Sequence, residues 1–159
     1  MHFSLHWKKN YKMKKYTNIS DIDNISETIQ EAIELKKNPF QFAELGKQKT
    51  IAMLFFNSSL RTRLSTEKAA KNLGMEVTVL NVNDAWNLEF EDGTIMNLNT
   101  SEHVKEAAQV ISQYADVIAV RAFPSLTDKE KDESEFVINS FVKYASVPIV
   151  NMESSTAHP

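Results

Sequence analysis

The stretch Phe55–Glu67, FFNSSLRTRLSTE, decides how the rest of the chain is interpreted. It begins as the apolar end of a predicted strand, passes through small polar residues, and continues as a predicted helix with Arg61 and Arg63 in its first turn. Exposed cations near a helix N-terminus oppose the helix dipole, at about 0.3–1 kcal/mol each. The arrangement becomes favourable when an anion binds there, because free N–H groups, a serine hydroxyl and guanidinium groups converge on one phosphate.

A simpler interpretation needs no ligand. Ser58 or Ser59 would then be only the N-cap of the helix, and both arginines would point into water. The residues of this stretch alone leave both interpretations open.

The composition excludes several kinds of site and partner. The 159 residues, 42% of them hydrophobic, suffice for one well-buried domain. A formal net charge of −3 gives no general attraction to nucleic acid or to an anionic membrane, so neither is an expected partner. The chain has no cysteine, which excludes disulfides, thiol nucleophiles and thiolate metal sites.

The hydrophobic pattern alternates between strands and helices. Apolar, strand-like runs occupy 49–56, 76–82, 116–123 and 147–152, and helical spacing occupies 18–37, 60–74, 101–115 and 128–144. This alternation predicts an α/β fold, a three-layer domain in which a mostly four-stranded parallel sheet is flanked by helices.

Several details of the helices are predicted as well. Gly74 is the expected C-cap of the helix that begins within the stretch Phe55–Glu67. Thr127 and Glu130 are spaced as a capping box for the helix over 128–144. Four apolar residues of the first of these helices are expected to face inward: Leu64, Ala69, Ala70 and Leu73.

Unusual polar residues gather where the predicted strands end. They are Ser59, Arg61 and Thr62 after the first strand, Trp86 after the second, Arg121 at the end of the third, and Glu153 and His158 after the fourth. The carboxyl ends of parallel strands share one edge of the sheet, and ligands bind beyond that edge. A binding site is therefore predicted there. Two alternatives stay open: Arg121 forms only a salt bridge with Glu153 or Asp116, and Trp86 only anchors its own loop.

The motif Ser59-Leu60-Arg61-Thr62-Arg63 resembles the carbamoyl-phosphate signature of the aspartate and ornithine carbamoyltransferases, whose usual form is Ser-Thr-Arg-Thr-Arg. Leu60 departs from that form and resembles the variant of the acylornithine carbamoyltransferases, which act on N-acetyl- or N-succinylornithine. Val120-Arg121-Ala122-Phe123 and His158-Pro159 resemble the other carbamoyl-phosphate contacts of the family. The resemblance covers most of 13–159.

The resemblance implies a role for each of these residues. Ser59, Leu60, Arg61 and Thr62 would hold the phosphate, Leu60 through its backbone N–H. Thr62, Arg121 and His158 would bind the carbonyl oxygen and act in catalysis. The reaction would need no metal, no other cofactor and no covalent intermediate.

Three further residues match positions that contact the acylornithine in the family. Trp86 would reach into a neighbouring subunit's site, and Glu153 would contact the acylated amino acid. Ser101 resembles the position that separates acetyl from succinyl substrates, where a small neutral residue tolerates the succinyl carboxylate. Its alternative role is the N-cap of the following helix.

The resemblance implies a carbamoyltransferase of arginine biosynthesis. It would transfer the carbamoyl group of carbamoyl phosphate to the side-chain amine of an N-acylornithine, with N-succinylornithine preferred over N-acetylornithine. A cytoplasmic homotrimer is expected. Residues 13–159 would be the carbamoyl-phosphate-binding domain, residues 1–12 a disordered extension, and the C-terminal amino-acid-binding domain would be absent, leaving this chain inactive alone.

Two other functions remain as alternatives. The chain is either a non-catalytic phosphate-binding or subunit-interaction fragment, or part of an ordinary ornithine carbamoyltransferase. Leu60 and Trp86 argue against the latter.

Overall fold

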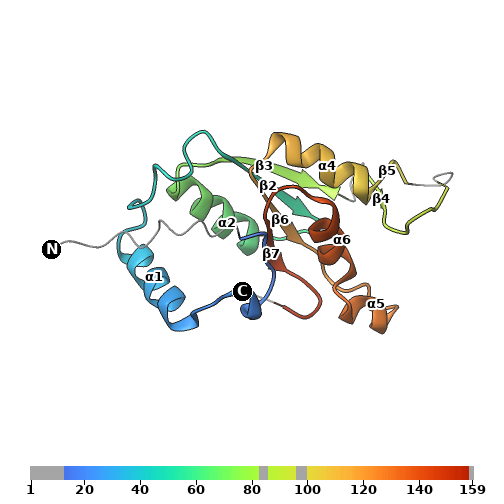
Figure 1. Ribbon diagram of the computed structural model, residues 1–159, viewed down its shortest axis with the longest axis horizontal. Coiled ribbons are helices and arrows are strands. Elements are labelled where there is room, and N and C mark those ends of the chain that lie inside the picture. The colour runs from blue at the N-terminus through green and yellow to red at the C-terminus, as the bar shows by residue number, and fades with distance from the viewer. Residues whose placement is uncertain (1–12, 83–85, 96–99, 158–159) are drawn as a thin grey trace.

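The computed structural model describes residues 13–82, 86–95 and 100–157 (Figure 1). The expectation that 1–12 form a disordered extension lies outside these residues. The elements in chain order are β1 (Lys15–Tyr16), the short 3-10 helix η2 (Ile19–Asp21), α1 (Ile25–Lys37), β2 (Thr50–Phe55), α2 (Arg61–Asn72), β3 (Glu76–Asn81), β4 (Leu88–Glu89), β5 (Glu102–His103), α4 (Val104–Tyr114), β6 (Val117–Arg121), α5 (Lys129–Glu133), α6 (Phe136–Tyr144) and β7 (Ile149–Glu153).

The main sheet has five strands in the order β1-β7-β6-β2-β3, and every neighbouring pair is parallel. The predicted α/β class is confirmed. Four of the strands are the predicted ones, and the fifth, β1, adds two residues at one edge. The long segment between β3 and α4 contributes a separate two-stranded pair, β4 and β5.

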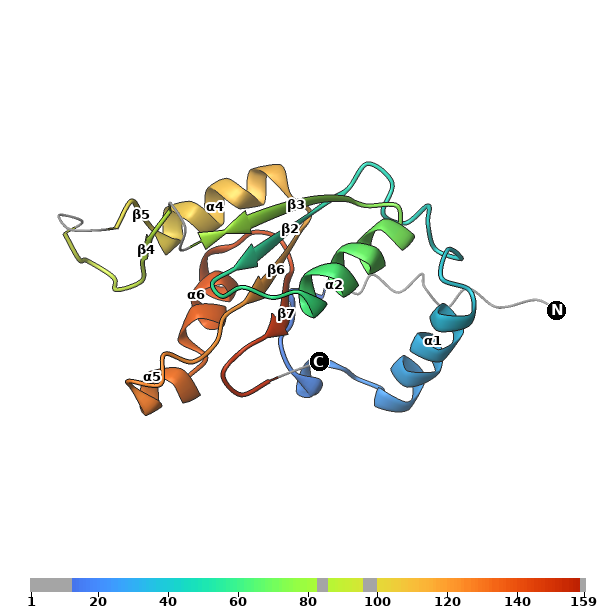
Figure 2. The ribbon, with the colours of Figure 1, turned by 180° about the vertical axis from the view of Figure 1, so that it is seen from behind.

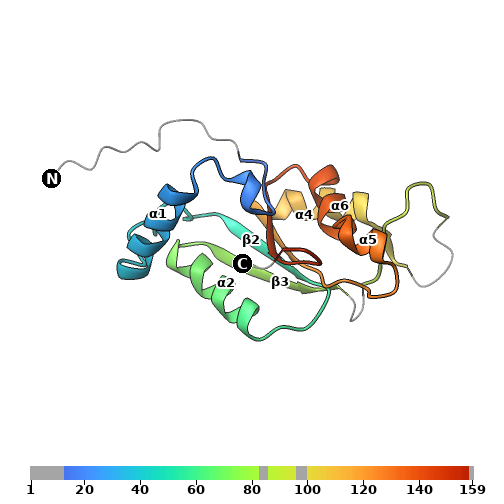
Figure 3. The same cartoon turned by 90° about the horizontal axis from the view of Figure 1, so that it is seen from below.

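Helices cover both faces of this sheet, which makes the domain three-layered. Figure 3 shows α2 on one side and α4 with α6 on the other. Alternate residues of each strand face opposite sides. In β2, Ala52 and Leu54 pack into the core under α4 and α6, whereas Met53 and Phe55 pack into the core that includes Ala70 of α2.

The first helical segment is shorter than predicted. The expectation of one helix over 18–37 is wrong: η2 and α1 are separate, and their N-caps are Asn18 and Asn24, whose side chains accept hydrogen bonds from the backbone N–H groups of Ser20 and Glu27. Asparagine side chains that bond to nearby N–H groups begin helices rather than continue them. None of the residues of α1 is buried, and Ile25 and Ile29 are about half exposed.

Two other helix details are wrong. The segment 128–144 forms two helices, because Glu135 has a left-handed backbone (φ 53°) between α5 and α6. Asp128 caps α5 by accepting from the N–H of Lys131, so no Thr127 capping box forms. The break at Glu135 directs its side chain to the turn after β7, where it accepts hydrogen bonds from Ser154 and Thr156.

On α2 the inward face is narrower than predicted. Ala70 is buried, but Leu64 is 59% exposed and Ala69 is also exposed. Leu73 is half-buried. The C-cap is Leu73, one residue before the predicted Gly74. Gly74 follows it with φ at 83°, and a Cβ there would overlap the carbonyl oxygen of Ala43. Glycine meets both demands because it lacks that atom.

Strand register brings the polar strand ends level. Phe55 at the end of β2 is opposite Asn81 of β3 and Arg121 of β6. An irregularity between Val120 and Arg121 then shifts the pairing of β6 with β7, so that Arg121 is opposite Glu153. Registered neighbours on adjacent strands point to the same face of the sheet. The irregularity therefore places the arginine beside the glutamate.

Candidate functional site

The loop from Phe56 to Leu60 leaves β2 at this edge and is fixed to β6 at two points. The backbone N–H of Phe56 donates to the carbonyl oxygen of Arg121 (3.0 Å), and the Asn57 side-chain oxygen accepts from the N–H of Phe123 (2.8 Å). These contacts hold the start of α2 against the end of β6. Asn57 is not among the predicted site residues, although an asparagine close after a buried strand is a typical loop anchor.

The first turn of α2 is open to an anion. Leu60 occupies the N-cap position, makes no side-chain capping bond and is 73% exposed. The Ser59 hydroxyl accepts from the N–H of Thr62 (3.3 Å). Within the described residues, the backbone N–H groups of Leu60, Arg61 and Arg63 have no acceptor. The turn itself contains no acidic residue, so no side chain of its own compensates its positive end.

Arg121 is buried at the end of β6, with 5% of its surface exposed. Its Nε donates to Glu153 Oε2 (2.8 Å), and one terminal nitrogen donates to the carbonyl oxygens of Asn57 and Ser58 (3.0 Å each). The guanidinium also lies over the Phe123 ring, 4.0 Å from its centre. None of the described residues accepts a hydrogen bond from the other terminal nitrogen.

Glu153 lies between Arg121 and the helix. It is 9% exposed, and besides the ion pair its Oε2 accepts from the Thr62 hydroxyl at the long distance of 3.5 Å. A buried ion pair of this kind is costly to break from one side, because removing one partner leaves the other charge buried. Glu153 therefore joins the ends of β6, β7 and α2.

These groups border one cleft of about 970 Å³, lined from α2 by Ser59, Leu60, Arg61 and Thr62 and from the sheet by Arg121 and Glu153, together with Tyr16, Ser58, Ser65, Thr66, Phe123, Val150, Asn151 and Met152. The structure thus brings six of the predicted site residues together. Of the other residues predicted at this edge, Trp86 does not line the cleft, and His158 lies outside the described residues. Figure 2 shows α2 beside the ends of β6 and β7.

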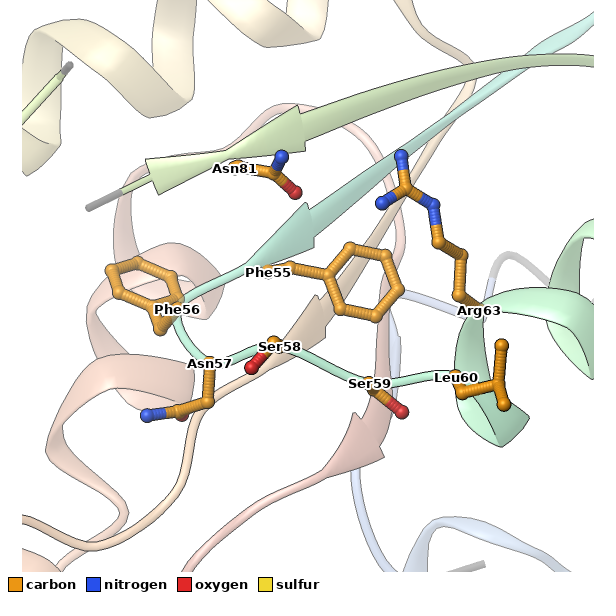
Figure 4. A pocket seen from close by; sticks show the side chains of 8 residues that line it. All are labelled: Phe55, Phe56, Asn57, Ser58, Ser59, Leu60, Arg63 and Asn81. Atoms are coloured by element: carbon orange, nitrogen blue, oxygen red, sulfur yellow. The ribbon is translucent and has the colours of Figure 1, made fainter. Parts of the chain in front are cut away.

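Arg63 lies on the other side of the loop. It lines a second hollow, about 570 Å³, with Phe55, Phe56, Asn57, Ser58, Ser59, Leu60 and Asn81 (Figure 4). Its guanidinium is 5.8 Å from the centre of the Phe55 ring. The two arginines of the signature therefore border different hollows, Arg61 the larger one with Arg121 and Arg63 the smaller one.

Trp86 and Ser101 do not line the larger cleft. The Trp86 indole donates to Glu102 Oε2 (3.0 Å) and packs against the core under α4 and α6. This agrees with the alternative that Trp86 anchors its own loop. Ser101 is exposed, and its N–H donates to the carbonyl oxygen of Asn87 (2.8 Å). The alternative of Ser101 as N-cap is wrong, because His103 caps α4.

The segment that carries Trp86 and Ser101 is held to α6 by charges. Lys143 and the Tyr144 hydroxyl donate to Asp92 (2.8 and 2.6 Å). The hydrogen bond from Lys143 is the main cause of a lowered pKa at Asp92, and the same bond raises the pKa of Lys143. These two bonds join Asp92 to α6. No sequence signal pointed to this attachment.

Two general findings bear on the kind of site. Among the residues that the structure describes, no group of three or more His, Asp or Glu side chains is arranged to hold a metal ion. In the same part of the chain, no helix combines the length and the apolar character needed to cross a bilayer.

Comparison with known proteins assigns the family. The family model of the aspartate/ornithine carbamoyltransferase carbamoyl-P binding domain matches residues 14–159. The chain belongs to this family. It is 48% identical over 148 residues to the N-succinylornithine carbamoyltransferase of Bacteroides thetaiotaomicron, and 46% identical over 132 residues to the N-acetylornithine carbamoyltransferase of Xylella fastidiosa. The first alignment covers 92% of this chain and 46% of the relative, and the second covers 80% of this chain and 39% of the relative.

A solved structure supports the same assignment. A mutant of N-acetyl-L-ornithine transcarbamylase, complexed with carbamyl phosphate and N-succinyl-L-norvaline, matches with a TM-score of 0.84 and 41% identity. The match covers 92% of this chain and 44% of that chain. This carbamoyltransferase-family chain thus spans about half the length of the relatives it matches.

Proposed function

We propose that this chain binds carbamoyl phosphate in the cleft between α2 and the ends of β6 and β7, as the carbamoyl-phosphate-binding part of an N-acylornithine carbamoyltransferase. The observation that carries the proposal is the convergence in that cleft of two sets of donors. The first turn of α2 offers Arg61 and N–H groups without an acceptor among the described residues, and Arg121 offers one terminal nitrogen. The two sets suit the two ends of carbamoyl phosphate.

The phosphate belongs at the helix and the carbonyl oxygen at Arg121. Three phosphate oxygens match several N–H donors and a flexible cation. The Nε of Arg121 donates to Glu153, and one terminal nitrogen donates to two carbonyl oxygens, so only the other terminal nitrogen is left for a ligand. One nitrogen suits a single carbonyl oxygen better than a phosphate, which arginine usually binds with two nitrogens. Thr62 would donate to the same oxygen, and His158 is proposed as the third donor.

The geometry serves carbamoyl transfer in a direct way. The amine nitrogen bonds to the carbonyl carbon, the bond from that carbon to the phosphate oxygen breaks, and the nitrogen loses a proton. Negative charge grows on the carbonyl oxygen and on the leaving phosphate. Donors fixed at both places stabilise this charge, and one such donor typically contributes about 2.7–4 kcal/mol. Arg121 is fixed by its protein contacts before the substrate arrives.

The acceptor amine is proposed to be that of an N-acylornithine, with the succinyl form preferred. The support is the naming of the relatives, the N-succinyl-L-norvaline bound to the mutant transcarbamylase, and a small neutral side chain at Ser101 that is exposed. Trp86 is proposed to reach into a neighbouring subunit's site, and Glu153 to contact the acylated amino acid. Arginine biosynthesis, a cytoplasmic location and a homotrimer are proposed with it.

Calorimetric titration with carbamoyl phosphate and with inorganic phosphate tests the first part. The wild-type chain is expected to bind both, and Arg61→Ala to weaken binding at least about tenfold, because it removes a charged donor. Arg63→Ala is the matched control, since it removes the same charge two residues away, on the other hollow. A folded wild-type chain that binds neither ligand, or an equal loss in both variants, would contradict the proposal.

The acyl preference has its own test. In saturating carbamoyl phosphate, an enzyme that joins this chain to an amino-acid-binding domain is expected to bind N-succinyl-L-norvaline more tightly than N-acetyl-L-norvaline. Ser101→Glu should reverse the order, because a carboxylate there repels the succinyl carboxylate. If the order of the two affinities is unchanged in Ser101→Glu, Ser101 does not determine the acyl preference.

A further inference from the structure

The turn after β7 is held from outside by a single carboxylate. Glu135, at the junction of α5 and α6, accepts three hydrogen bonds on Oε1: from the Ser154 hydroxyl (2.7 Å), the Thr156 N–H (2.7 Å) and the Thr156 hydroxyl (2.6 Å). The two partners lie nineteen and twenty-one positions further along the chain. Bonds to an ionised acceptor are about twice as strong as neutral ones.

The turn itself is closed on the inside. The backbone N–H of Ser154 donates to the carbonyl oxygen of Ala157 (2.8 Å), and the Asn151 amide donates to the Ser154 hydroxyl (2.7 Å). The same amide reaches the carbonyl oxygen of Thr17 beyond β1 (3.0 Å). Ser154 is buried, at 8% exposure. Glu135 is thus the outer end of a network that runs under the carboxyl end of β7.

The backbone conformation of Glu135 indicates that surrounding contacts hold this residue in place. Its φ of 53° lies in the left-handed region, which a residue with a long side chain rarely adopts. Such conformations persist only where surrounding contacts hold them, and they concentrate at functional sites. The left-handed backbone breaks the helix between α5 and α6. Its side chain, as the three bonds show, reaches the turn.

The turn begins directly after a residue of the proposed site. Glu153 is the last residue of β7, pairs with Arg121 and precedes Ser154 without a spacer. The N–H of Ala122 also donates to the carbonyl oxygen of Glu153 (2.9 Å), so a shift of the turn would move both partners of the ion pair. The coupling from Glu135 to Arg121 passes through two residues.

We infer that Glu135 is a positioning residue for the anion site: it fixes the turn 154–157, and through Glu153 it fixes the donor edge of Arg121. Glu135 does not line the cleft itself. The inference rests on the proposed function for its consequence in ligand binding. Its structural part, the coupling of Glu135 to Arg121, does not.

The decisive variant is Glu135→Asn in the full chain. Asparagine tolerates a left-handed backbone well, but its side chain is one methylene shorter, so it keeps the local conformation and loses the reach. Glu135→Gln keeps the length and the acceptor oxygen without the charge. Glu130→Ala is the control, because it removes an exposed carboxylate from the neighbouring α5.

Two signals report the coupling without any ligand. In Glu135→Asn, amide hydrogen exchange at Thr156 is expected to rise at least about tenfold, and the Nε–H resonance of Arg121 in a ¹H–¹⁵N spectrum is expected to move. Glu135→Gln should lie between the wild type and Glu135→Asn, and Glu130→Ala should match the wild type. An unmoved Arg121 resonance in a folded Glu135→Asn chain would overturn the inference.

Ligand binding gives the second readout. The affinity for inorganic phosphate and for carbamoyl phosphate is expected to fall about threefold to tenfold in Glu135→Asn and to recover in part in Glu135→Gln. If the wild-type chain binds neither, the proposed function fails, while the Arg121 and Thr156 signals still decide the coupling. If the wild type binds and Glu135→Asn binds equally well, the positioning role is overturned.

Discussion

Arg121 and Arg61 border the same cleft in opposite surroundings. Arg121 is 5% exposed, and a carboxylate, two carbonyls and an aromatic ring hold it. Arg61 stands on the first turn of α2, exposed to solvent, and its side chain forms no hydrogen bond or ion pair with any described residue. The protein has fixed one cation before a ligand arrives and has left the other to be fixed by the ligand.

The difference separates stability from binding. The contacts of Arg121 contribute to folding, so its removal affects the whole domain. Arg61 contributes nothing comparable to the fold, and its position at the positive end of α2 even opposes it. A residue that costs stability without a partner is best explained by a ligand. Three changes at the cleft test this comparison, and a fourth concerns an acidic group elsewhere in the fold.

Arg121→Ala is expected to lower the free energy of unfolding by about 3–5 kcal/mol, because Glu153 would remain buried without its partner. Urea unfolding measures the loss. The double variant Arg121→Met with Glu153→Met should recover most of it, since no uncompensated charge remains. A loss below about 1 kcal/mol in Arg121→Ala would show that the pair is not a structural element.

Arg61→Glu is expected to move stability and binding in opposite directions. An acid in the first turn suits the helix dipole, so the free energy of unfolding should rise by about 0.5–1 kcal/mol at low salt and less at high salt. Phosphate binding should disappear, because a negative charge replaces the cation. Retained phosphate binding would show that the anion lies elsewhere.

Ser59→Ala is expected to cost about 1 kcal/mol of stability, because the N–H of Thr62 loses its acceptor. Ser58→Ala is the matched control, since its hydroxyl forms no hydrogen bond with the described residues. Urea unfolding of the two variants compares them. Equal losses would mean that the Ser59 hydroxyl is not the effective cap.

The fourth change concerns an acidic group away from the cleft. At Asp21, burial raises the pKa, but hydrogen bonds from Thr17, Lys15 and Asn18 together outweigh it and lower the pKa to about 2. The folded pKa lies below the unfolded value near 3.9, so this stabilisation is complete above about pH 4 and is lost as pH falls toward 2.

Acid titration followed by circular dichroism checks this. Asp21→Asn should lose stability at neutral pH and show a weaker pH dependence between about pH 4 and 2. Asp23→Asn, at an exposed carboxylate on the same segment, is the control. Identical acid curves for wild type and Asp21→Asn would show that Asp21 is not the group concerned.

The local pattern predicted those elements that a local cause determines. The four apolar runs are strands, and Gly74 follows the C-cap of α2, because burial and a left-handed turn follow from the residues themselves. The errors fall where a side chain competes with its own backbone, as at Asn24, or where distant partners override helical spacing, as at Glu135. Periodicity alone contains neither effect.

The residues of the site were also predicted in part, and the contacts between them were not. The signature predicted the first turn of α2, and the strand ends predicted Arg121 and Glu153 at one edge. The two interpretations of Arg121, a salt bridge or a ligand contact, are compatible, because the guanidinium pairs with Glu153 and still lines the cleft. Trp86 was placed at the same edge, yet its indole bonds to Glu102.

The sequence by itself determined the alternation of strands and helices, the family signature and the residues that gather at the strand ends. Each of these depends on neighbours within a few positions. Only the tertiary structure decided that β6 lies between β2 and β7, that an irregularity places Arg121 opposite Glu153, and that Glu135 reaches across to the turn after β7. Such contacts join residues tens of positions apart, and their energy comes from burial and charge pairing that no local pattern contains.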